Sequence, residues 1–133
     1  AKTKELLLYM DKEYHDSIKR HYCTDDGSFE FSGFTTNKLK EVLNNSNIDI
    51  VYTVGPEIMM KKVVEICDEF KVDCQLSLER YMKCGYGICG SCCVDPMGIR
   101  MCVEGPCIDK ETAKKVTEFG KYHRDGSGKK NYY

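Results

Sequence analysis

Apolar and polar positions along this chain follow two periods, one typical of strands and one typical of helices. The clearest case is residues 48–70: an almost unbroken, β-branched apolar run at 48–54 leads into Gly55-Pro56, and apolar residues at helical spacing follow. Such a run is typical of a strand buried on both faces, and proline suits the first turn of a helix. The pattern therefore predicts a strand, a turn and a helix in succession.

Other patterns extend this order. An apolar run at 6–9 predicts a strand, Tyr14 and Ile18 lie four residues apart at helical spacing, and 35–45 has a helical apolar stripe. Residues 72–78 alternate between apolar and polar, as in a half-buried strand. The first eighty residues thus alternate strands with helices, which predicts an α/β fold with a parallel sheet covered by helices.

The character of the sequence changes after residue 80. Residues 81–109 are rich in cysteine and glycine, with a short apolar stretch at 99–103 that predicts a strand. Residues 110–133 begin as a short helix and end as a polar, glycine-containing and basic tail, which we expect to be mobile. We therefore expect an α/β unit at 1–80, a cysteine-rich segment at 81–109, and a helix with a polar tail at 110–133.

Charge and length exclude several classes of partner. The chain has 133 residues, with 20 basic and 21 acidic side chains and a net charge of −1. This balance gives no electrostatic reason to expect binding to nucleic acid or to an anionic membrane. No apolar run approaches the roughly 20 residues that span a bilayer, and the first ten residues do not resemble a secretory signal. We expect a soluble cytoplasmic protein.

Nine cysteines are many for a chain of this length, and five of them fall within residues 83–102. An odd number, tight clustering and the lack of an export signal argue against a disulfide framework and favour a metal site. The scattered cysteines, Cys23, Cys67 and Cys74, are expected to be small buried hydrophobic residues.

The spacing within the cluster is specific. Cys84, Cys89 and Cys92 have the C-x4-C-x2-C spacing of plant-type [2Fe–2S] proteins, and Cys102 follows after nine residues. Two irons bridged by two sulfides leave four outer positions, which four thiolates fill. The interleaved glycines would let a short loop wrap the cluster and point its amides at sulfur. The spacing therefore favours a [2Fe–2S] cluster.

Two alternatives remain for the same cysteines. Four thiolates also bind structural zinc, although a zinc ribbon usually has two C-x2-C knuckles and only one is present here. The remaining pair, Cys93 and Cys107, would suit a thiol redox sensor. Cys93 directly follows a ligand, so we expect its side chain to point away from the metal.

Several segments resemble one known family. "SLERYMKCGYGICGSCCVDPMGIRMCVEGP" and "GPEIMMKKVVE" are similar to the electron-transfer subunits of type B dihydroorotate dehydrogenases, and "AKTKELLLY" and "TDDGSFEFSGFTT" resemble earlier parts of the same subunits. The resemblance implies part of a ferredoxin reductase-type nicotinamide domain followed by a small, irregular [2Fe–2S] domain. It implies that the cluster ligands are Cys84, Cys89, Cys92 and Cys102.

The resemblance also implies a function and partners. In this family electrons pass between FAD and the FMN of a catalytic subunit through the [2Fe–2S] cluster, which couples dihydroorotate oxidation to NAD reduction in pyrimidine biosynthesis. The chain would be an electron-transfer component of an oxidoreductase rather than a catalyst alone. Related modules serve other flavoprotein oxidoreductases, which is the alternative.

Parts of the family pattern are missing from this sequence. We find neither the FAD-binding barrel nor the first strand of the nicotinamide domain with a G-x-G-x-x-G turn that is followed by a helix. We therefore expect that the chain alone binds neither FAD nor NAD, and that it is either a fragment of a longer protein or works with another chain that carries the FAD domain.

One further site is expected from the resemblance. Gly55, Pro56 and Glu57 follow a predicted parallel strand, where ligands of open α/β sheets bind, and would face a nicotinamide cleft. Thr24, Asp25 and Asp26 could line the same cleft. The alternatives are a plain strand-to-helix turn at 55–57 and an Asx-type turn at 24–28.

Overall fold

The computed structural model describes all 133 residues, and the chain divides into two compact units, residues 1–46 and residues 47–133. The boundary that we expected near residue 80 lies inside the second unit. Strands on either side of it belong to one sheet, because residues 75–77 pair with residues 107–109. The cysteine-rich segment is thus built onto the same unit as the second half of the α/β pattern.

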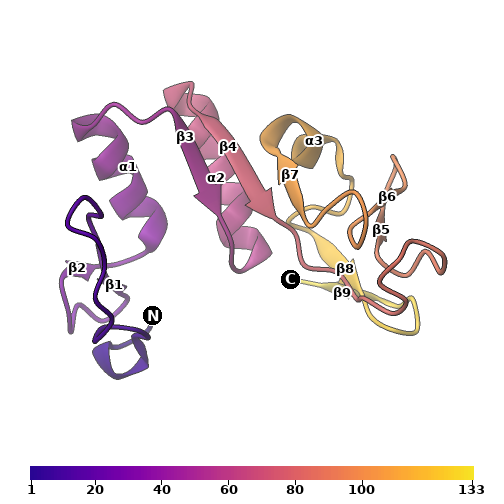
Figure 1. Cartoon of the computed structure of the whole chain (residues 1–133), viewed down its shortest axis with the longest axis horizontal. Coiled ribbons are helices and arrows are strands. Elements are labelled where there is room, and N and C mark those ends of the chain that lie inside the picture. The colour runs from indigo at the N-terminus through magenta and orange to yellow at the C-terminus, as the bar shows by residue number, and fades with distance from the viewer. The chain divides into compact units, whose positions relative to one another are not determined.

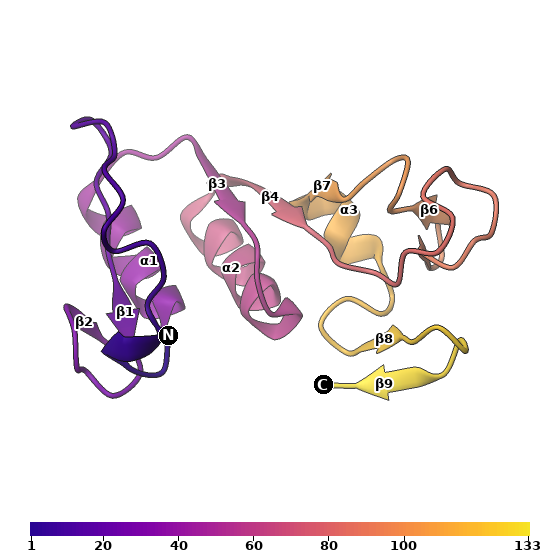
Figure 2. The same ribbon diagram turned by 60° about the horizontal axis from the view of Figure 1, so that its bottom comes forward.

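The first unit contains little regular structure. It comprises a 3-10 turn (η1, Lys4–Leu6), a two-stranded parallel pair (β1, Cys23–Thr24; β2, Phe31–Ser32) and one helix (α1, Thr35–Asn45) (Figures 1 and 2). The helix at 35–45 is confirmed.

Two predictions in the first unit are wrong. Residues 7–22 form turns and irregular chain, without the strand at 6–9 or the helix around Tyr14 and Ile18. The side chains of Tyr14 and Ile18 are 44% and 53% exposed, so a short helix here would bury too little apolar surface to offset its nucleation cost.

The second unit is organised around a three-stranded sheet in the order β3–β4–β7. Strands β3 (Ile50–Thr53) and β4 (Asp73–Ser77) are parallel, with Val51 opposite Cys74, and β7 (Cys107–Asp109) is antiparallel to β4. Helix α2 (Glu57–Phe70) makes the crossover between the parallel strands, and both views show it lying along them (Figures 1 and 2). Helix α3 (Lys110–Lys115) directly follows β7.

The core of the second unit lies between α2, the sheet and the segments after β4 and α3. Strand β4 alternates as its sequence predicts, with Cys74 and Leu76 buried between exposed neighbours. The prediction that β3 is buried on both faces is wrong, since Tyr52 is 71% exposed: the single helix of this crossover covers one face of the strand only. The buried apolar side chains of this unit are Met60, Val63, Val64, Ile66, Cys67, Cys74, Leu76, Leu78, Cys92, Val94, Met101, Ile108, Ala113, Val116 and Phe119.

Two short hairpins complete the second unit. The first joins β5 (Cys93–Val94) to β6 (Ile99–Arg100) and lies between Cys92 and Cys102 along the chain. The predicted strand at 99–103 therefore ends early, because residues 101–104 form a turn in which Glu104 accepts hydrogen bonds from Arg100.

The second hairpin joins β8 (Tyr122–Arg124) to β9 (Lys130–Tyr132), so the segment that we expected to be a mobile tail is ordered (Figure 2). Its turn is closed by Asp125, whose carboxylate accepts hydrogen bonds from Ser127 and from the Lys129 amide. The Ser127 contacts are the main cause of the fall in the Asp125 pKa to about 2. No helix in the protein combines the length and the apolar character that a bilayer crossing requires.

Candidate functional site

The four predicted ligand cysteines lie on the irregular segment that leaves β4 and on the turn after β6. Their thiols approach one another as two pairs. Cys84 and Cys89 share a side-chain hydrogen bond, and so do Cys92 and Cys102. The Cys102 amide also donates to the Cys92 sulfur at 3.4 Å. The pairs are neighbours, since the charge of Cys84 acts on Cys102.

The sulfur of Cys84 lies in a cradle of backbone amides. The N–H groups of Cys89, Tyr86 and Ile88, in that order of importance, donate to this sulfur and lower the pKa of the Cys84 thiol to about 6. Amides that converge on one atom stabilise an anion, as in other backbone anion sites. At neutral pH Cys84 is therefore mainly a thiolate, the form that binds metal.

Cys102 has the opposite tendency. Its hydrogen bond with Cys92, together with burial, raises its pKa, while the amide of Gly87 lowers it. The backbone thus directs amides at the sulfurs of Cys84, Cys92 and Cys102, which is the environment expected for ligands of an anionic cluster.

Gly87 is a position where the loop requires glycine. Its φ is +80°, and a Cβ atom would lie 2.9 Å from the Val103 side chain and 3.0 Å from the guanidinium of Arg100. Arg100 also donates to the Gly87 carbonyl at 3.3 Å and forms an ion pair with Glu104. The glycine therefore lets the loop close against the turn that carries Cys102.

The two remaining cysteines of the segment belong to strands. Cys93 pairs with Arg100 in the β5–β6 ladder, and burial is the first cause of the rise in its pKa. Cys107 is exposed at the start of β7, opposite Ser77 in the three-stranded sheet. No three Cys, His, Asp or Glu side chains of the chain converge as closely as a mononuclear metal site requires. The four predicted ligand cysteines are thus arranged as two neighbouring thiol pairs.

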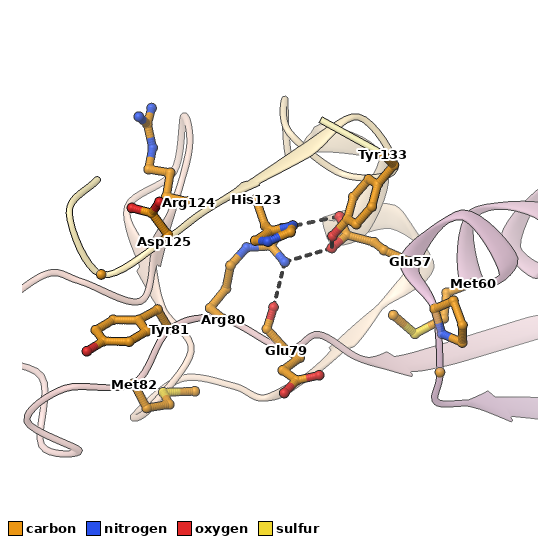
Figure 3. A pocket seen from close by; sticks show the side chains of 13 residues that line it. Glu57, Met60, Glu79, Arg80, Tyr81, Met82, His123, Arg124, Asp125 and Tyr133 are labelled. Carbon is orange, nitrogen blue, oxygen red and sulfur yellow. Dashed lines mark hydrogen bonds and ion pairs between the residues drawn. The ribbon is translucent and has the colours of Figure 1, made fainter. Parts of the chain in front are cut away.

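A cavity of about 1000 Å³ lies at the carboxyl end of β3 (Figure 3). Gly55, Pro56 and Glu57 line one side, as the sequence predicts for a cleft at this end of the strand. The segment 79–82 and the hairpin residues 123–126 line others, together with Tyr133. The cavity and the cysteine loop therefore share a chain segment: residues 79–82 line the cavity and lead directly to Cys84.

A buried ion cluster forms part of the cavity wall. Arg80 donates to both Glu57 oxygens, at 2.7 and 3.2 Å, and its Nε donates to Glu118 at 2.7 Å. The side chains of all three are no more than 4% exposed. Burial alone would lower the pKa of the guanidinium, but the hydrogen bonds and charges of Glu57 and Glu118 outweigh it and raise that pKa.

Glu57 is the better satisfied of the two carboxylates. Besides Arg80, it accepts from the Gly120 amide at 2.9 Å and from the Tyr133 hydroxyl at 2.8 Å. Burial, and then the Glu57 carboxylate, raise the pKa of the Tyr133 phenol. Oε2 of Glu118 has no hydrogen-bond partner. The carboxylate of Glu57 is thus bound within the protein rather than free to meet a ligand.

The other predicted cleft residues lie in the first unit. Thr24 is fully buried, and its hydroxyl exchanges hydrogen bonds with the backbone of Phe29. Asp26 accepts from the amide and hydroxyl of Ser28, as an Asx-type turn requires. Asp25 is exposed. The residues at 24–26 and those at 55–57 therefore belong to separate compact units.

Sequence reasoning missed Arg80, His123 and Tyr133, which line the cavity, and Glu118, which pairs with Arg80 behind its wall. A signal existed for Arg80, which continues the alternating series of buried residues Cys74, Leu76 and Leu78. A charge at such an inward position implies a buried partner, but the sequence does not identify Glu57, which lies 23 residues earlier, as that partner.

Comparison with known proteins relates this geometry to one family. Residues 79–114 match the family model of the iron–sulfur cluster binding domain of dihydroorotate dehydrogenase B. This range includes Arg80, all four cysteines and most of α3, so the cluster loop and its flanks form one recognised unit.

The whole chain is similar to proteins described as probable dihydroorotate dehydrogenase B (NAD(+)) electron transfer subunits. It is 56% identical to that of Methanocaldococcus jannaschii over all 133 residues, which is 51% of the relative. It is 45% identical to that of Methanothermobacter thermautotrophicus over 98% of this chain and 48% of the relative. The chain spans about half the length of these relatives.

A solved structure gives the same assignment of fold. The chain is similar to one in the structure of the NADH-dependent reduced ferredoxin–NADP oxidoreductase, described in a study of flavin-based electron bifurcation, with a TM-score of 0.62 and 34% identity. The similarity covers 72% of this chain and 34% of that one. The prediction of an α/β, reductase-like fold is confirmed.

Proposed function

The chain is homologous to about half the length of dihydroorotate dehydrogenase B electron transfer subunits, and on this premise we propose that it relays single electrons through a [2Fe–2S] cluster. Cys84, Cys89, Cys92 and Cys102 are the proposed ligands. The observation that carries the proposal is the arrangement of these thiols as two neighbouring pairs.

The arrangement of the four thiols in two pairs fits a [2Fe–2S] cluster. Each iron of a [2Fe–2S] cluster has two outer ligand positions, so Cys84 with Cys89 would hold one iron and Cys92 with Cys102 the other. When bound, the cluster supplies one-electron oxidation and reduction. The chain itself presents thiolate at Cys84 at neutral pH and directs amides at the sulfurs of Cys84 and Cys102. Such amides offset the negative charge that the ligands bring together.

The exposed rim of the loop suits exchange of electrons with another protein. Tyr86 and Ile88, between the first two ligands, are 72% and 80% exposed. We propose that the partner is the FMN-containing catalytic subunit of a dihydroorotate dehydrogenase, and that FAD is held by the remainder of the electron-transfer assembly. Substrate chemistry would take place in those parts, and this chain would carry electrons between them.

The cavity at Gly55–Glu57 is proposed as part of the nicotinamide site of that assembly. Its wall is mainly apolar and includes the rings of Tyr81 and Tyr133, which suit a planar heterocycle. Gly55 and Pro56 would approach the ring through their backbone, because the carboxylate of Glu57 is already bound to Arg80 and Tyr133.

The test is metal analysis of anaerobically purified and reconstituted protein. We expect two irons and two sulfides per chain, visible absorption that dithionite bleaches, and an EPR signal after one-electron reduction. Single Cys→Ser changes at 84, 89, 92 or 102 should lower cluster content, whereas Cys93→Ser and Cys107→Ser are the matched controls that should retain it. A colourless protein that binds one zinc and cannot be reconstituted with iron and sulfide would refute the proposal.

The proposed partner needs a separate experiment. Anaerobic affinity purification of the reconstituted chain should co-purify a flavoprotein that contains FMN. Electrons should then pass from the reduced chain to the bound flavin in stopped-flow measurements. A stable complex in which the flavin stays oxidised would exclude the electron-relay role even if the cluster is present.

A further inference from the structure

The hairpin β8–β9 contacts the cavity and the segment that leads to the cysteine loop. Figure 3 shows Tyr133 beside Glu57 at one side of the cavity, and Tyr81 and Met82 near Arg124 and Asp125 at the other. The hairpin therefore spans the cavity between its two walls. The contacts at each end of the hairpin connect it to the residues that precede Cys84.

At one end the hairpin is attached to the buried ion cluster. The Tyr133 hydroxyl donates to Glu57 at 2.8 Å, and the rings of His123 and Tyr133 lie 5.3 Å apart. Glu57 in turn binds Arg80, which is only four residues before Cys84. A hydrogen bond to a charged group is among the stronger ones in proteins, so this half-buried contact holds the end of the hairpin against Glu57.

At the other end the turn of the hairpin packs against Tyr81. A Cβ atom on Gly126 would lie 2.8 Å from Cζ of the Tyr81 ring and 3.1 Å from its hydroxyl oxygen. The backbone of Gly126 is not in the left-handed region, so its conformation does not require glycine. A side chain at this position would therefore require the Tyr81 ring to move.

A third contact reaches the far side of the cysteine loop. Arg124 lies 3.5 Å from a carboxylate oxygen of Asp95, and the Asp95 carbonyl accepts a hydrogen bond from the Thr117 amide at 2.9 Å. Asp95 lies two residues after Cys93 along the chain. The hairpin thus contacts the loop before its first ligand cysteine, Cys84, and between its third and fourth, Cys92 and Cys102.

We propose that the β8–β9 hairpin is a positioning element for the cysteine loop and that it acts through the contact of Gly126 with Tyr81. Tyr81 is three residues before Cys84, so a displaced ring moves the chain that enters the loop. Tyr81 also lines the cavity, so the planar ring of a ligand bound in the cavity would contact the residue on which the hairpin acts. The link to electron transfer rests on the proposed function, but the positioning of the loop does not.

The test is Gly126→Ala in metal-free protein, with hydrogen exchange of the amides at 83–89 as the measurement. The added methyl group must displace the Tyr81 ring, and we expect exchange in this segment to accelerate at least fivefold while the amides of α2 keep their protection. The double variant Gly126→Ala/Tyr81→Ala removes the collision, so its exchange should equal that of Tyr81→Ala alone. Lys129→Ala, an exposed change in the same turn, is the control and should leave exchange at 83–89 unchanged.

Reconstituted protein gives the second measurement. With a cluster bound, Gly126→Ala should change the EPR line shape of the reduced form and Lys129→Ala should not. Exchange at 83–89 within twofold of wild type in both Gly126→Ala and Tyr81→Ala would overturn the proposal. If Gly126→Ala also accelerates exchange of the α2 amides, the variant has lost more than the contact, and the exchange of Tyr81→Ala at 83–89 then tests the proposal by itself. Tyr81→Ala breaks the contact without introducing a collision. If the chain binds no iron–sulfur cluster, the metal-free experiment still decides, so failure of this proposal and failure of the proposed function are distinguishable.

Discussion

Replacing Arg80 with methionine is the most informative change to the cavity wall. Arg80 is the only cation between the carboxylates of Glu57 and Glu118, and the side chains of all three are 1–4% exposed. Arg80→Met keeps an unbranched chain of similar length but leaves two carboxylates buried without their cation.

The size of the effect follows from this burial. Removing one partner of a buried ion pair typically costs about 3–5 kcal/mol, because the other charge stays desolvated. We therefore expect Arg80→Met to lower the free energy of unfolding of the second unit by about 3–5 kcal/mol. The exposed pair of Lys62 and Glu65 on α2, at 3.1 Å, supplies the control. Lys62→Met should cost about 0–1 kcal/mol.

The assay is native-state hydrogen exchange of α2 in metal-free protein, which reports the opening free energy of the second unit separately from that of the first. The double change Arg80→Met/Glu118→Met should be less destabilising than the sum of the two single changes, because it removes one of the stranded charges. If Arg80→Met costs no more than Lys62→Met, the ion cluster does not hold the cavity wall together and the reasoning fails.

Two further predictions concern single side chains. Backbone amides lower the pKa of Cys84 to about 6, so its alkylation by iodoacetamide in metal-free protein should reach half of its maximal rate near pH 6. The buried Cys74, whose pKa is raised to about 12, should stay unmodified. Mass spectrometry of peptides pulse-labelled between pH 5 and 9 measures both rates, and a midpoint near pH 9 for Cys84 would contradict the amide cradle. Asp109 caps α3 through a 2.7 Å hydrogen bond from the Thr112 amide, so Asp109→Ala should cost about 1 kcal/mol in urea unfolding. The same hydrogen bond lowers the Asp109 pKa below 3.8, so the extra stability of wild type over Asp109→Ala should be complete above pH 3.8 and shrink as the pH falls below it. If this stability difference persists unchanged to pH 2, the ionised carboxylate is not the cap.

The sequence predicted those elements whose period is strong and whose partners are local. Helix α2, with apolar residues at regular helical spacing over 14 residues, and strand β4, with strict alternation, form where expected. Tyr14 and Ile18 have the same spacing but no apolar surface that covers them, so the helix does not form. A pattern shows which face a helix would bury, but not whether the rest of the fold supplies a surface against it.

The candidate site shows the same division. The spacing of Cys84, Cys89 and Cys92 is local and was readable, whereas the attachment of Arg80 to Glu57 and Glu118 joins residues 23 and 38 positions apart. The hairpin at 122–132 did carry a signal, because Asp125-Gly126 is a common turn dipeptide. Its charged and polar composition suggested a mobile tail instead, and the Tyr122–Tyr132 pair that supports it becomes visible only in the folded chain.

The attachment of Tyr133 to Glu57 has a consequence for biosynthesis. The two residues are 76 positions apart, so their hydrogen bond cannot form until residue 133 has been synthesised. At roughly 5–20 residues per second, the 31 residues between Cys102 and Tyr133 (133 minus 102) take about 2–6 s to translate. For that time a nascent chain carries all four thiols before Glu118 and the closing hairpin can complete their surroundings. Protection of the thiols from oxidation, and the timing of metal delivery, therefore fall within these seconds.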